Sequence, residues 1–438
     1  MEALRHRELG QPSSPTPEHY IAVRLSTDAM RVLIVSTQFP FPARSGYERR
    51  VYGLAREVAS RHSVTLLSYA RPDQLEDVRN LATELTVTVV ERPLIARRQR
   101  RLMQFGSVVS RTPFAVREIH SNEMQSALND LCARSSFDLI QLEGSVLCQF
   151  TFPANVPVIL DEHNIEHELL ARMRTGERSL LRRSFSGLQR NRVRRFEERC
   201  WLSVAGCAVT SAREEPLISS IAPDTPTAVV PNAADIDYFH SLNELVQPHT
   251  MAFTGVLDYR PNVDAALYLV DEIWPHVLAR FPDAQLTIVG RVGEAERRRL
   301  RRPSVTLTGE VPDVRPHLAR ANVVGVPVRI GGGTRLKVVE GMAMGKAVVS
   351  TSLGCEGLDV IDGEHLLIAN DAAAFASSVS TLFEDAERCR ALGSAARALA
   401  ERRYSWRLAG ERLDSLYQRV LDRHARALDP DPAVPPIS

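Results

Sequence analysis

Apolar and polar positions alternate along this chain between two kinds of segment. Short runs of Val, Ile, Leu and Ala predict buried strands, and longer stretches between them carry apolar residues at helical spacing. This alternation is typical of parallel sheets with helices on both faces. The strands expected in the first half are Arg31–Ser36, Ser63–Ser68, Thr86–Val90, Leu139–Leu142, Val158–Leu160, Ala205–Thr210 and Ala228–Val230.

A second series of the same kind follows a polar stretch at 241–250, which has the composition of a linker. We therefore expect two Rossmann-like α/β domains, at residues 30–230 and 231–405, that face each other across a cleft. Residues 1–29 and 426–438 lack periodicity and are expected to be tails. The strands expected in the second half are Met251–Gly255, Ala284–Val289, Val305–Leu307 and Val323–Pro327, and the clearest helices are Gly46–Arg61, Val263–Arg280 and Pro312–Ala321.

A glycine-rich turn follows the strand that begins at Val323, and it predicts an anion site. Gly332 and Gly333 stand in a run of three glycines, Thr334 is expected to cap a short helix, and Gly345 is expected to end it. Glycines let backbone N–H groups approach a ligand, and the first N–H groups of a helix have no internal partners. A diphosphate would satisfy these donors.

Three charged residues near the start of this helix extend the prediction. Arg335 and Lys337 place cations where the helix dipole favours anions, and Glu340, nearly one turn further, could bind ribose or sugar hydroxyls. The ordinary interpretation of Lys337 and Glu340 is a surface ion pair worth about 0.2–0.5 kcal/mol. Lysine, however, occurs only at 337 and 346 among 54 basic residues. We therefore favour a nucleotide-binding role.

A dense polar cluster, Asp161-Glu162-His163-Asn164-Ile165-Glu166-His167, follows another buried strand. The carboxyl ends of parallel strands are where open α/β sheets bind ligands. Each residue alone could instead belong to a surface turn or a helix cap. The two histidines have helical spacing without the His-Glu-x-x-His order, so zinc is not favoured. We expect His163 to contact substrate, with Asp161 and Asn164 nearby and Gly46, at the start of the first helix, also on the acceptor side.

Arginines recur from Arg172 to Arg199 among apolar residues, which predicts a long basic amphipathic segment. It is either a solvated helix face or a surface that docks on anionic lipid headgroups. A net charge of +1 argues against nucleic acid as a partner. Six scattered cysteines, no long apolar run and no secretory signal favour a cytoplasmic protein. If the basic segment docks on lipid, the protein would be peripheral on the inner face of the membrane.

Several of these segments, in this order, resemble the GT-B glycosyltransferases, in particular retaining family 4 enzymes of bacterial exopolysaccharide and cell-envelope synthesis. The resemblance covers roughly 31–405, and Tyr404-Ser405-Trp406 resembles the start of the family's last helix, expected here at 406–425, which packs back on the N-terminal domain. The motifs that carry it are Asp161-Glu162-His163-Asn164, Val230-Pro231-Asn232, Phe253-Thr254-Gly255, Pro261-Asn262-Val263-Asp264 and Gly332–Ser350.

The resemblance implies a donor site for a nucleotide-diphosphate sugar. Glu340 matches the second glutamate of the family's Glu-x7-Glu motif, which binds ribose, whereas Gly332 stands in place of the first. Asn262 stands where the family has a lysine, so Arg335 and Lys337 are inferred to bind the diphosphate. The donor-binding residues implied by the resemblance are Asn232, Gly255, Gly332, Gly333, Thr334, Arg335, Lys337 and Glu340, of which the last three, with His163, are the catalytic candidates.

The predicted reaction moves a sugar, with retention, to a glycan or lipid-linked acceptor by front-face attack beside the departing diphosphate. It needs no cofactor and no metal, and Asp235-x-Asp237 lies at the domain crossing rather than in a metal-motif context. Two alternatives stay open because of Gly332. One is a non-catalytic subunit that binds a sugar nucleotide, and the other is a GT-B epimerase or hydrolase.

Overall fold

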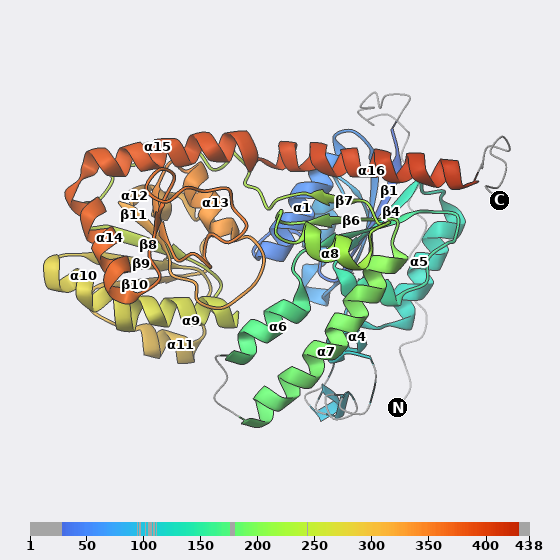
Figure 1. The fold of residues 1–438 in the computed structure, drawn as a ribbon, viewed down its shortest axis with the longest axis horizontal. Helices are drawn as coiled ribbons and strands as arrows, with labels where there is room; N and C mark the ends of the chain where they lie inside the picture. Colours follow the sequence, from blue (N-terminus) through green and yellow to red (C-terminus); the bar gives the residue numbers. More distant parts are fainter. Residues whose placement is uncertain are drawn as a thin grey trace, which may run out of the picture.

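The computed structural model describes residues 29–428 except positions 94, 96–97, 101, 104–106, 108–109, 111, 176–179 and 243. Side chains at 173–186 and at 188 are also outside the description. Most of both expected tails, and several arginines of the basic segment, therefore lie outside the described residues. Within the described ranges the chain folds into two α/β domains, which Figure 1 shows side by side.

The first domain is built on a parallel sheet with strand order β3-β2-β1-β4-β5-β6-β7. Every strand predicted for the first half is present, with bounds that differ by two residues at most. Because both faces of a parallel sheet are covered by helices, its strands are mostly apolar, and charged residues such as Glu143 and Asp161 stand near their carboxyl ends. The strands are β1 (Arg31–Ser36), β2 (Ser63–Ala70), β3 (Thr86–Glu91), β4 (Leu139–Glu143), β5 (Val158–Glu162), β6 (Gly206–Val209) and β7 (Thr227–Val229).

The second domain has a parallel sheet with strand order β10-β9-β8-β11-β12-β13. The four strands predicted by range are confirmed within two residues, and a strand also follows the short helix as predicted. The two-residue strand at the sheet's edge was not predicted. The strands are β8 (Thr250–Thr254), β9 (Gln285–Val289), β10 (Val305–Gly309), β11 (Val323–Val326), β12 (Ala347–Ser350) and β13 (Leu367–Ile368).

Helices cover both sheets, and one expected helix has an irregular centre. Between 260 and 280 the path consists of an α-helix, a π-helical stretch and a second α-helix, because Pro275 lacks the N–H that a regular helix needs there. The helices are α1 (Gly46–Ala59), η1 (Pro72–Gln74), α2 (Leu75–Leu81), α4 (Phe114–Ile119), α5 (Asn122–Arg134), η2 (Ser145–Gln149), α6 (Glu166–Thr175), α7 (Leu180–Ser203), α8 (Glu215–Ile221), α9 (Arg260–Tyr268), η3 (Leu269–Ile273), α10 (Trp274–Arg280), α11 (Glu294–Leu300), α12 (Arg315–Arg320), α13 (Leu336–Ala343), α14 (Ala372–Glu384), α15 (Ala386–Arg403) and α16 (Trp406–Leu428).

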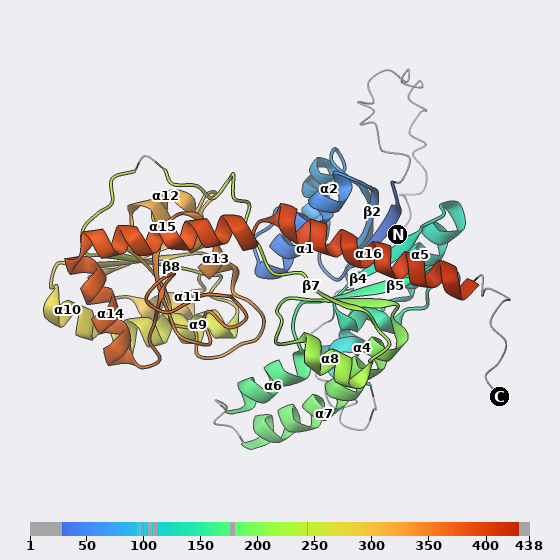
Figure 2. The same ribbon diagram turned by 45° about the horizontal axis from the view of Figure 1, so that its top comes forward.

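The last helix returns to the first domain, as the resemblance implied. In Figures 1 and 2, α15 lies along the second domain and α16 continues over the first. Leu413, Leu416 and Tyr417 of α16 belong to the apolar cluster that also contains residues of α1, β1 and β2. The helix ends at Leu428, three residues beyond its expected end. Backbone pairing of Ala234 with Ser405 joins the two places where the chain crosses between domains.

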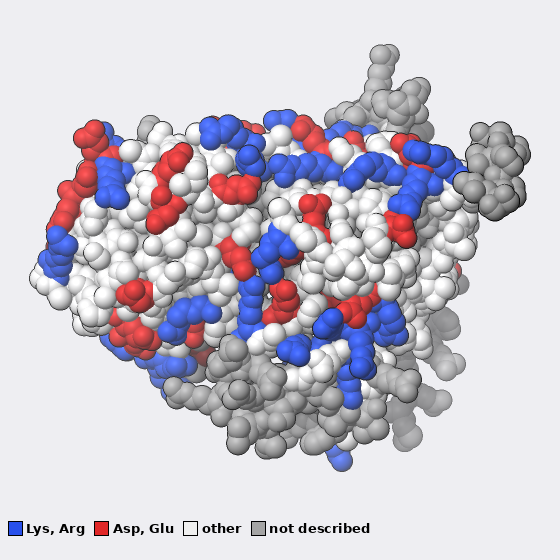
Figure 3. Space-filling model, viewed as in Figure 1, with Lys and Arg blue, Asp and Glu red and all other residues white. Residues whose placement is uncertain are grey.

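The basic segment 172–199 forms parts of two helices rather than one. α6 and α7 pack side by side, and their far ends extend away from the body of the first domain in both ribbon views. Arg172 differs from the expected surface role, since it pairs with Glu356 of the second domain at 2.5 Å. In Figure 3, basic side chains follow the edge formed by α15 and α16 and are interspersed with acidic ones.

Candidate active site

The start of α13 is the centre of the candidate site. The glycine run after β11 is present, but the helix begins at Leu336 and Arg335 occupies the capping position without a side-chain cap bond. The expected cap by Thr334 is therefore wrong. Asn232 of the crossing donates its Nδ2 to the Thr334 carbonyl oxygen at 3.1 Å, which holds Thr334 in the loop. Gly345 ends the helix in a left-handed conformation, as predicted.

Two glycines of the loop are required by its conformation. Gly331 and Gly333 have φ values of 134° and 68°, which favour residues without Cβ. A Cβ at Gly333 would also overlap Asn164 Oδ1 and would lie 3.0 Å from the His163 carbonyl oxygen. The loop of the second domain thus lies directly against the polar cluster that follows β5. The sequence predicted both sides of this contact without predicting that they meet.

The two cations expected near the helix start are present, and both are short of partners. Arg335 hydrogen-bonds the Gly332 and Gly333 carbonyl oxygens, while its Nη2 is buried without a partner in the described part of the chain. Lys337 donates its Nζ to Asn262 Oδ1 at 2.9 Å and lies 4.2 Å from the centre of the Phe253 ring. The ammonium group of Lys337 therefore lies beside Asn262, the residue that stands where the family has a lysine.

Burial leaves Lys337 electrostatically unsatisfied. Burial, and to a smaller extent the nearby Arg335 guanidinium, lower the pKa of Lys337 to about 7, although Glu340 opposes the shift. Burial also lowers the pKa of Arg335. Neither cation forms an ion pair with a carboxylate among the described residues. A cation held in this state would gain strongly from an incoming anion.

The Lys337–Glu340 surface ion pair, which was the ordinary alternative to a nucleotide-binding role, does not form. Glu340 is buried and pairs instead with Arg49 of α1, in the other domain. Arg49 was not among the predicted residues, although it follows Gly46 by less than one helical turn. Lys346 does not belong to the site, since its Nζ donates to the Ala319 carbonyl oxygen at 2.9 Å.

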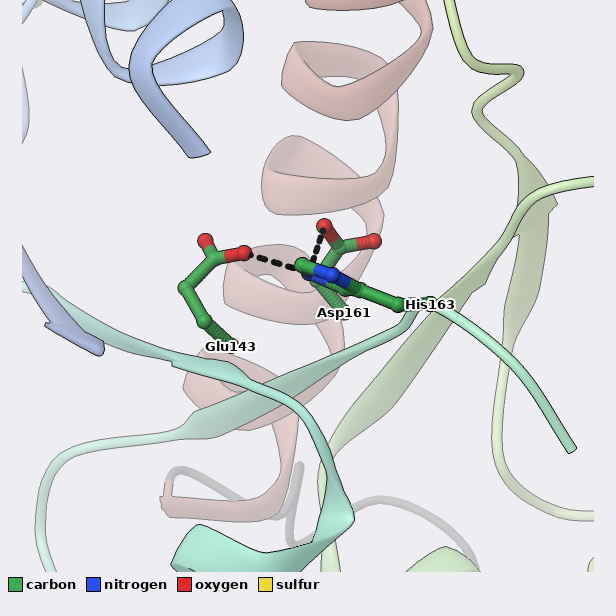
Figure 4. A group of neighbouring side chains, drawn as sticks. All are labelled: Glu143, Asp161 and His163. Atoms are coloured by element: carbon green, nitrogen blue, oxygen red, sulfur yellow. Dashed lines mark hydrogen bonds and ion pairs between the residues drawn. The ribbon is translucent and has the colours of Figure 1, made fainter. Parts of the chain in front are cut away.

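On the side of the first domain, His163 stands between two buried carboxylates (Figure 4). Its Nε2 is 2.8 Å from Glu143 Oε2 and 3.3 Å from Asp161 Oδ2. Burial alone would lower the pKa of His163, but these two acceptors raise it to about 9. The Tyr47 ring lies 4.8 Å from the imidazole, centre to centre. Glu143 was missed in the sequence, although it ends strand β4 just as Asp161 and Glu162 end β5.

Asp161 is held from behind by Arg50. The Arg50 Nε and Nη2 donate to the two Asp161 oxygens at 2.8 and 2.5 Å, and both side chains are fully buried. Although burial would raise the pKa of Asp161, Arg50 holds it well below its usual range. Asp161 therefore faces Arg50 and His163 rather than an open surface, and its predicted acceptor-side role stays a prediction.

Glu143, Asp161 and His163 carry ligand atoms within 4.8 Å of one another, a spacing that would also suit a metal ion. Here those atoms already serve one another as hydrogen-bond donors and acceptors, and Arg50 takes both Asp161 oxygens. Arg50 and a protonated His163 balance the two carboxylates. The cluster is therefore a charge-balanced hydrogen-bond network.

Further predicted residues meet at the interface of the two domains. A Cβ at Gly46 would lie 3.7 Å from Leu336, so α1 and α13 begin next to each other. Gly255 is close enough to Lys337 that a Cβ there would lie 3.0 Å from its Nζ. Asn232 also accepts from Arg50, at 3.1 Å, and so joins both halves of the site.

Two family models match the chain. One is described as glycosyl transferase 4-like domain and matches residues 45–233, and the other, glycosyl transferases group 1, matches residues 248–385. These ranges correspond to the two observed domains. The chain belongs to the family 4-like GT-B glycosyltransferases.

Curated relatives and solved structures agree with this membership. The chain is 32% identical over 216 residues to a phosphatidyl-myo-inositol mannosyltransferase of Mycobacterium tuberculosis, a match spanning 45% of the chain and 55% of the relative. It is also 32% identical over 210 residues to a GDP-mannose-dependent phosphatidylinositol monomannoside mannosyltransferase of Corynebacterium glutamicum, over 43% of the chain and 55% of the relative. The chain thus spans about half the length of these relatives.

The solved structures define the fold alone. Sucrose-phosphate synthase from Thermosynechococcus elongatus superposes with a TM-score of 0.69 at 19% identity, over 90% of this chain and 100% of that one. The Anabaena protein HepE in complex with UDP-glucose superposes with a TM-score of 0.62 at 14% identity, over 89% of this chain and 100% of that one. Both comparisons cover the two domains together and confirm the expected GT-B architecture.

Proposed function

We propose that this protein transfers a sugar from a nucleotide-diphosphate sugar to a glycan or lipid-linked acceptor with retention of anomeric configuration. One observation carries the proposal. At the start of α13 the Thr334 Oγ1 and the Arg335 Nη2 are buried without hydrogen-bond partners, and Lys337, whose pKa is lowered by burial, forms no ion pair with a carboxylate among the described residues. Buried polar groups are normally satisfied, so this group of atoms is suited to an anionic ligand.

The same geometry supports catalysis. When the bond between sugar and diphosphate breaks, negative charge grows on the diphosphate, and fixed donors aimed at it stabilise the transition state more than the ground state. Lys337, Arg335 and the first N–H groups of α13 are such donors. The reaction we propose needs no metal, because these cations stabilise the leaving group.

The orientation of the sugar would come from the opposite domain. His163 and Asn164 touch the glycine loop, so a donor sugar attached to a diphosphate at α13 would meet their side of the interface. The Asp161 and Glu143 carboxylates are not free to act as nucleophiles, since they are bound to Arg50 and His163. A front-face attack by the acceptor is therefore the proposed route to retention. NMR of the new glycosidic linkage tests it, and an inverted anomer would refute it.

A panel of UDP-, GDP-, ADP- and TDP-sugars, tested by calorimetry and by turnover, examines the proposal itself. We expect one donor to bind, and Glu340→Ala to abolish that binding. Glu384→Ala is the matched control, because Glu384 is an exposed ion-pair partner of Arg280 on α14. Binding without transfer or hydrolysis would identify a non-catalytic sugar-nucleotide-binding protein, and turnover without an acceptor would identify an epimerase or hydrolase.

A lipid-linked acceptor is supported by the curated relatives, whose names place their acceptors on phosphatidylinositol. No helix in the described part of the chain has the length and apolar character to cross a bilayer. The arm formed by α6 and α7 is the proposed contact with an anionic membrane surface. Co-sedimentation with vesicles containing phosphatidylserine at low salt tests this, and a protein that stays in the supernatant would rule it out.

A further inference from the structure

A chain of buried hydrogen bonds connects the last helix to His163. The Tyr417 hydroxyl of α16 donates to Gln141 Oε1 on β4, and Gln141 Nε2 donates to Glu143 Oε1 at 2.5 Å. The other Glu143 oxygen lies 2.8 Å from His163 Nε2. All but His163 are fully buried. These hydrogen bonds lead from α16, on the outer side of the first domain, to the interface with the second domain.

With Glu143 ionised, one arrangement of donors and acceptors satisfies every group in this hydrogen-bond network. A Gln141 amide that accepts from a phenol must offer its NH₂ group to Glu143, which as a carboxylate only accepts. Glu143 and Asp161 both present acceptors to His163 Nε2, so that nitrogen must carry a proton. The Nδ1 atom has no hydrogen-bond partner among the described residues and is left for a ligand.

We propose that Glu143 is a positioning residue that fixes the ring and the Nε2 proton of His163, and that Gln141 and Tyr417 anchor Glu143 to the C-terminal helix. With Nε2 bound inward, the imidazolium offers its Nδ1–H to an oxygen of the substrate. Because the His163 carbonyl already lies against the glycine loop, the substrate oxygen would belong to the donor sugar or its diphosphate. This last assignment rests on the function proposed above.

Charge supports the arrangement. Arg50 neutralises Asp161, which leaves Glu143 with His163 as its cation, and the two carboxylates raise the pKa of His163 to about 9. Removing the charge of Glu143 withdraws one of the two negative charges that stabilise the imidazolium. The titratable and charged groups around the imidazole are Glu143 from β4, Asp161 from β5, Tyr47 and Arg50 from α1 and Glu166 from α6.

The test is an NMR titration of the His163 ring in the protein without substrate, with the signal assigned through His163→Asn. In the wild type we expect a charged ring through neutral pH. In Glu143→Gln the titration midpoint should fall by about one unit or more, because the isosteric amide keeps the shape and removes the charge. An unchanged midpoint in Glu143→Gln would overturn the proposal.

A second pair of variants examines the link to α16. Tyr417→Phe should shift the His163 ring signals and lower kcat at unchanged KM for the donor. Tyr69→Phe is the matched control, since Tyr69 is a buried tyrosine whose hydroxyl donates to the Ile119 carbonyl oxygen at 2.7 Å, away from His163. Equal effects from both would show that Tyr417 acts only through stability and would overturn the link. Titration shifts in a protein that binds no sugar nucleotide would refute the proposed function and leave the positioning role standing.

Discussion

Replacing Lys337 with Met should remove a proton that the protein takes up when it binds its donor. Burial lowers the pKa of Lys337 to about 7 from an ordinary value of 10.5, which corresponds to about 5 kcal/mol against the charged form. At pH 8 only about a tenth of the molecules then carry the ammonium. A bound diphosphate supplies the missing counter-charge and returns the pKa toward its ordinary value, so binding should take up about 0.9 protons per site.

Calorimetry in two buffers with different heats of ionisation measures this uptake. A sugar nucleotide suits the assay because its diphosphate, esterified at both ends, does not titrate near neutral pH. The wild type should take up about 0.9 protons at pH 8 and about 0.1 at pH 6, whereas Lys337→Met should take up almost none at either pH. Donor affinity should fall by at least about tenfold. Equal uptake by both proteins would refute the placement of the diphosphate at Lys337.

The same shift predicts how stability changes with pH. Between pH 7 and 10.5 the unfolded chain holds a proton on Lys337 that the folded chain lacks, so this residue makes stability rise with pH across that window. Below pH 7 its unfavourable contribution is constant. Lys337→Met should therefore be more stable than the wild type near pH 7, and the difference should shrink toward pH 10. A less stable Met variant at pH 7 would contradict the reasoning.

Three further substitutions test the interface by urea denaturation. Arg49→Ala should lower the free energy of unfolding by about 1–3 kcal/mol, because the buried Glu340 carboxylate on α13 loses its partner. An unchanged free energy of unfolding would show that stability does not depend on the pair. Gly333→Ala should lower the free energy of unfolding by more than twice as much as Gly363→Ala, because Gly363 also has a positive φ but open space around it. Equal losses of stability would exclude the overlap with Asn164 as the cause. Asp161→Ala should lower the free energy of unfolding by about 3–5 kcal/mol, because it leaves Arg50 buried and unpaired. A loss of stability below about 1 kcal/mol would mean that Arg50 pairs with another group in the variant.

The sequence predicted those parts of the fold that local physics determines. Strands such as the predicted Val158–Leu160 are visible because a parallel strand buried on both faces is mostly apolar. The glycine run was visible because positive φ values favour glycine. Both halves of the site could be found in this way, since each follows the carboxyl end of a strand.

Contacts between distant segments could not be predicted in the same way. Arg49 and Glu340 pair across 291 positions of the sequence, and nothing local to Arg49 distinguishes it from other arginines of the chain. The predicted cap at Thr334 was wrong because of another distant contact. Asn232 of the crossing donates to the Thr334 carbonyl oxygen and holds this residue in the loop. Glu143 stayed hidden because its partner His163 follows a different strand, β5.

The placement of α16 has a consequence for the order of folding during synthesis. Its residues Leu413, Leu416 and Tyr417 complete an apolar cluster most of whose other members belong to the first domain. The ribosome makes the whole second domain before it makes α16. The second domain can therefore reach its final structure first, while the first domain keeps an apolar face uncovered until the last helix emerges. We therefore expect the second domain to fold before the first, although the first domain is synthesised earlier.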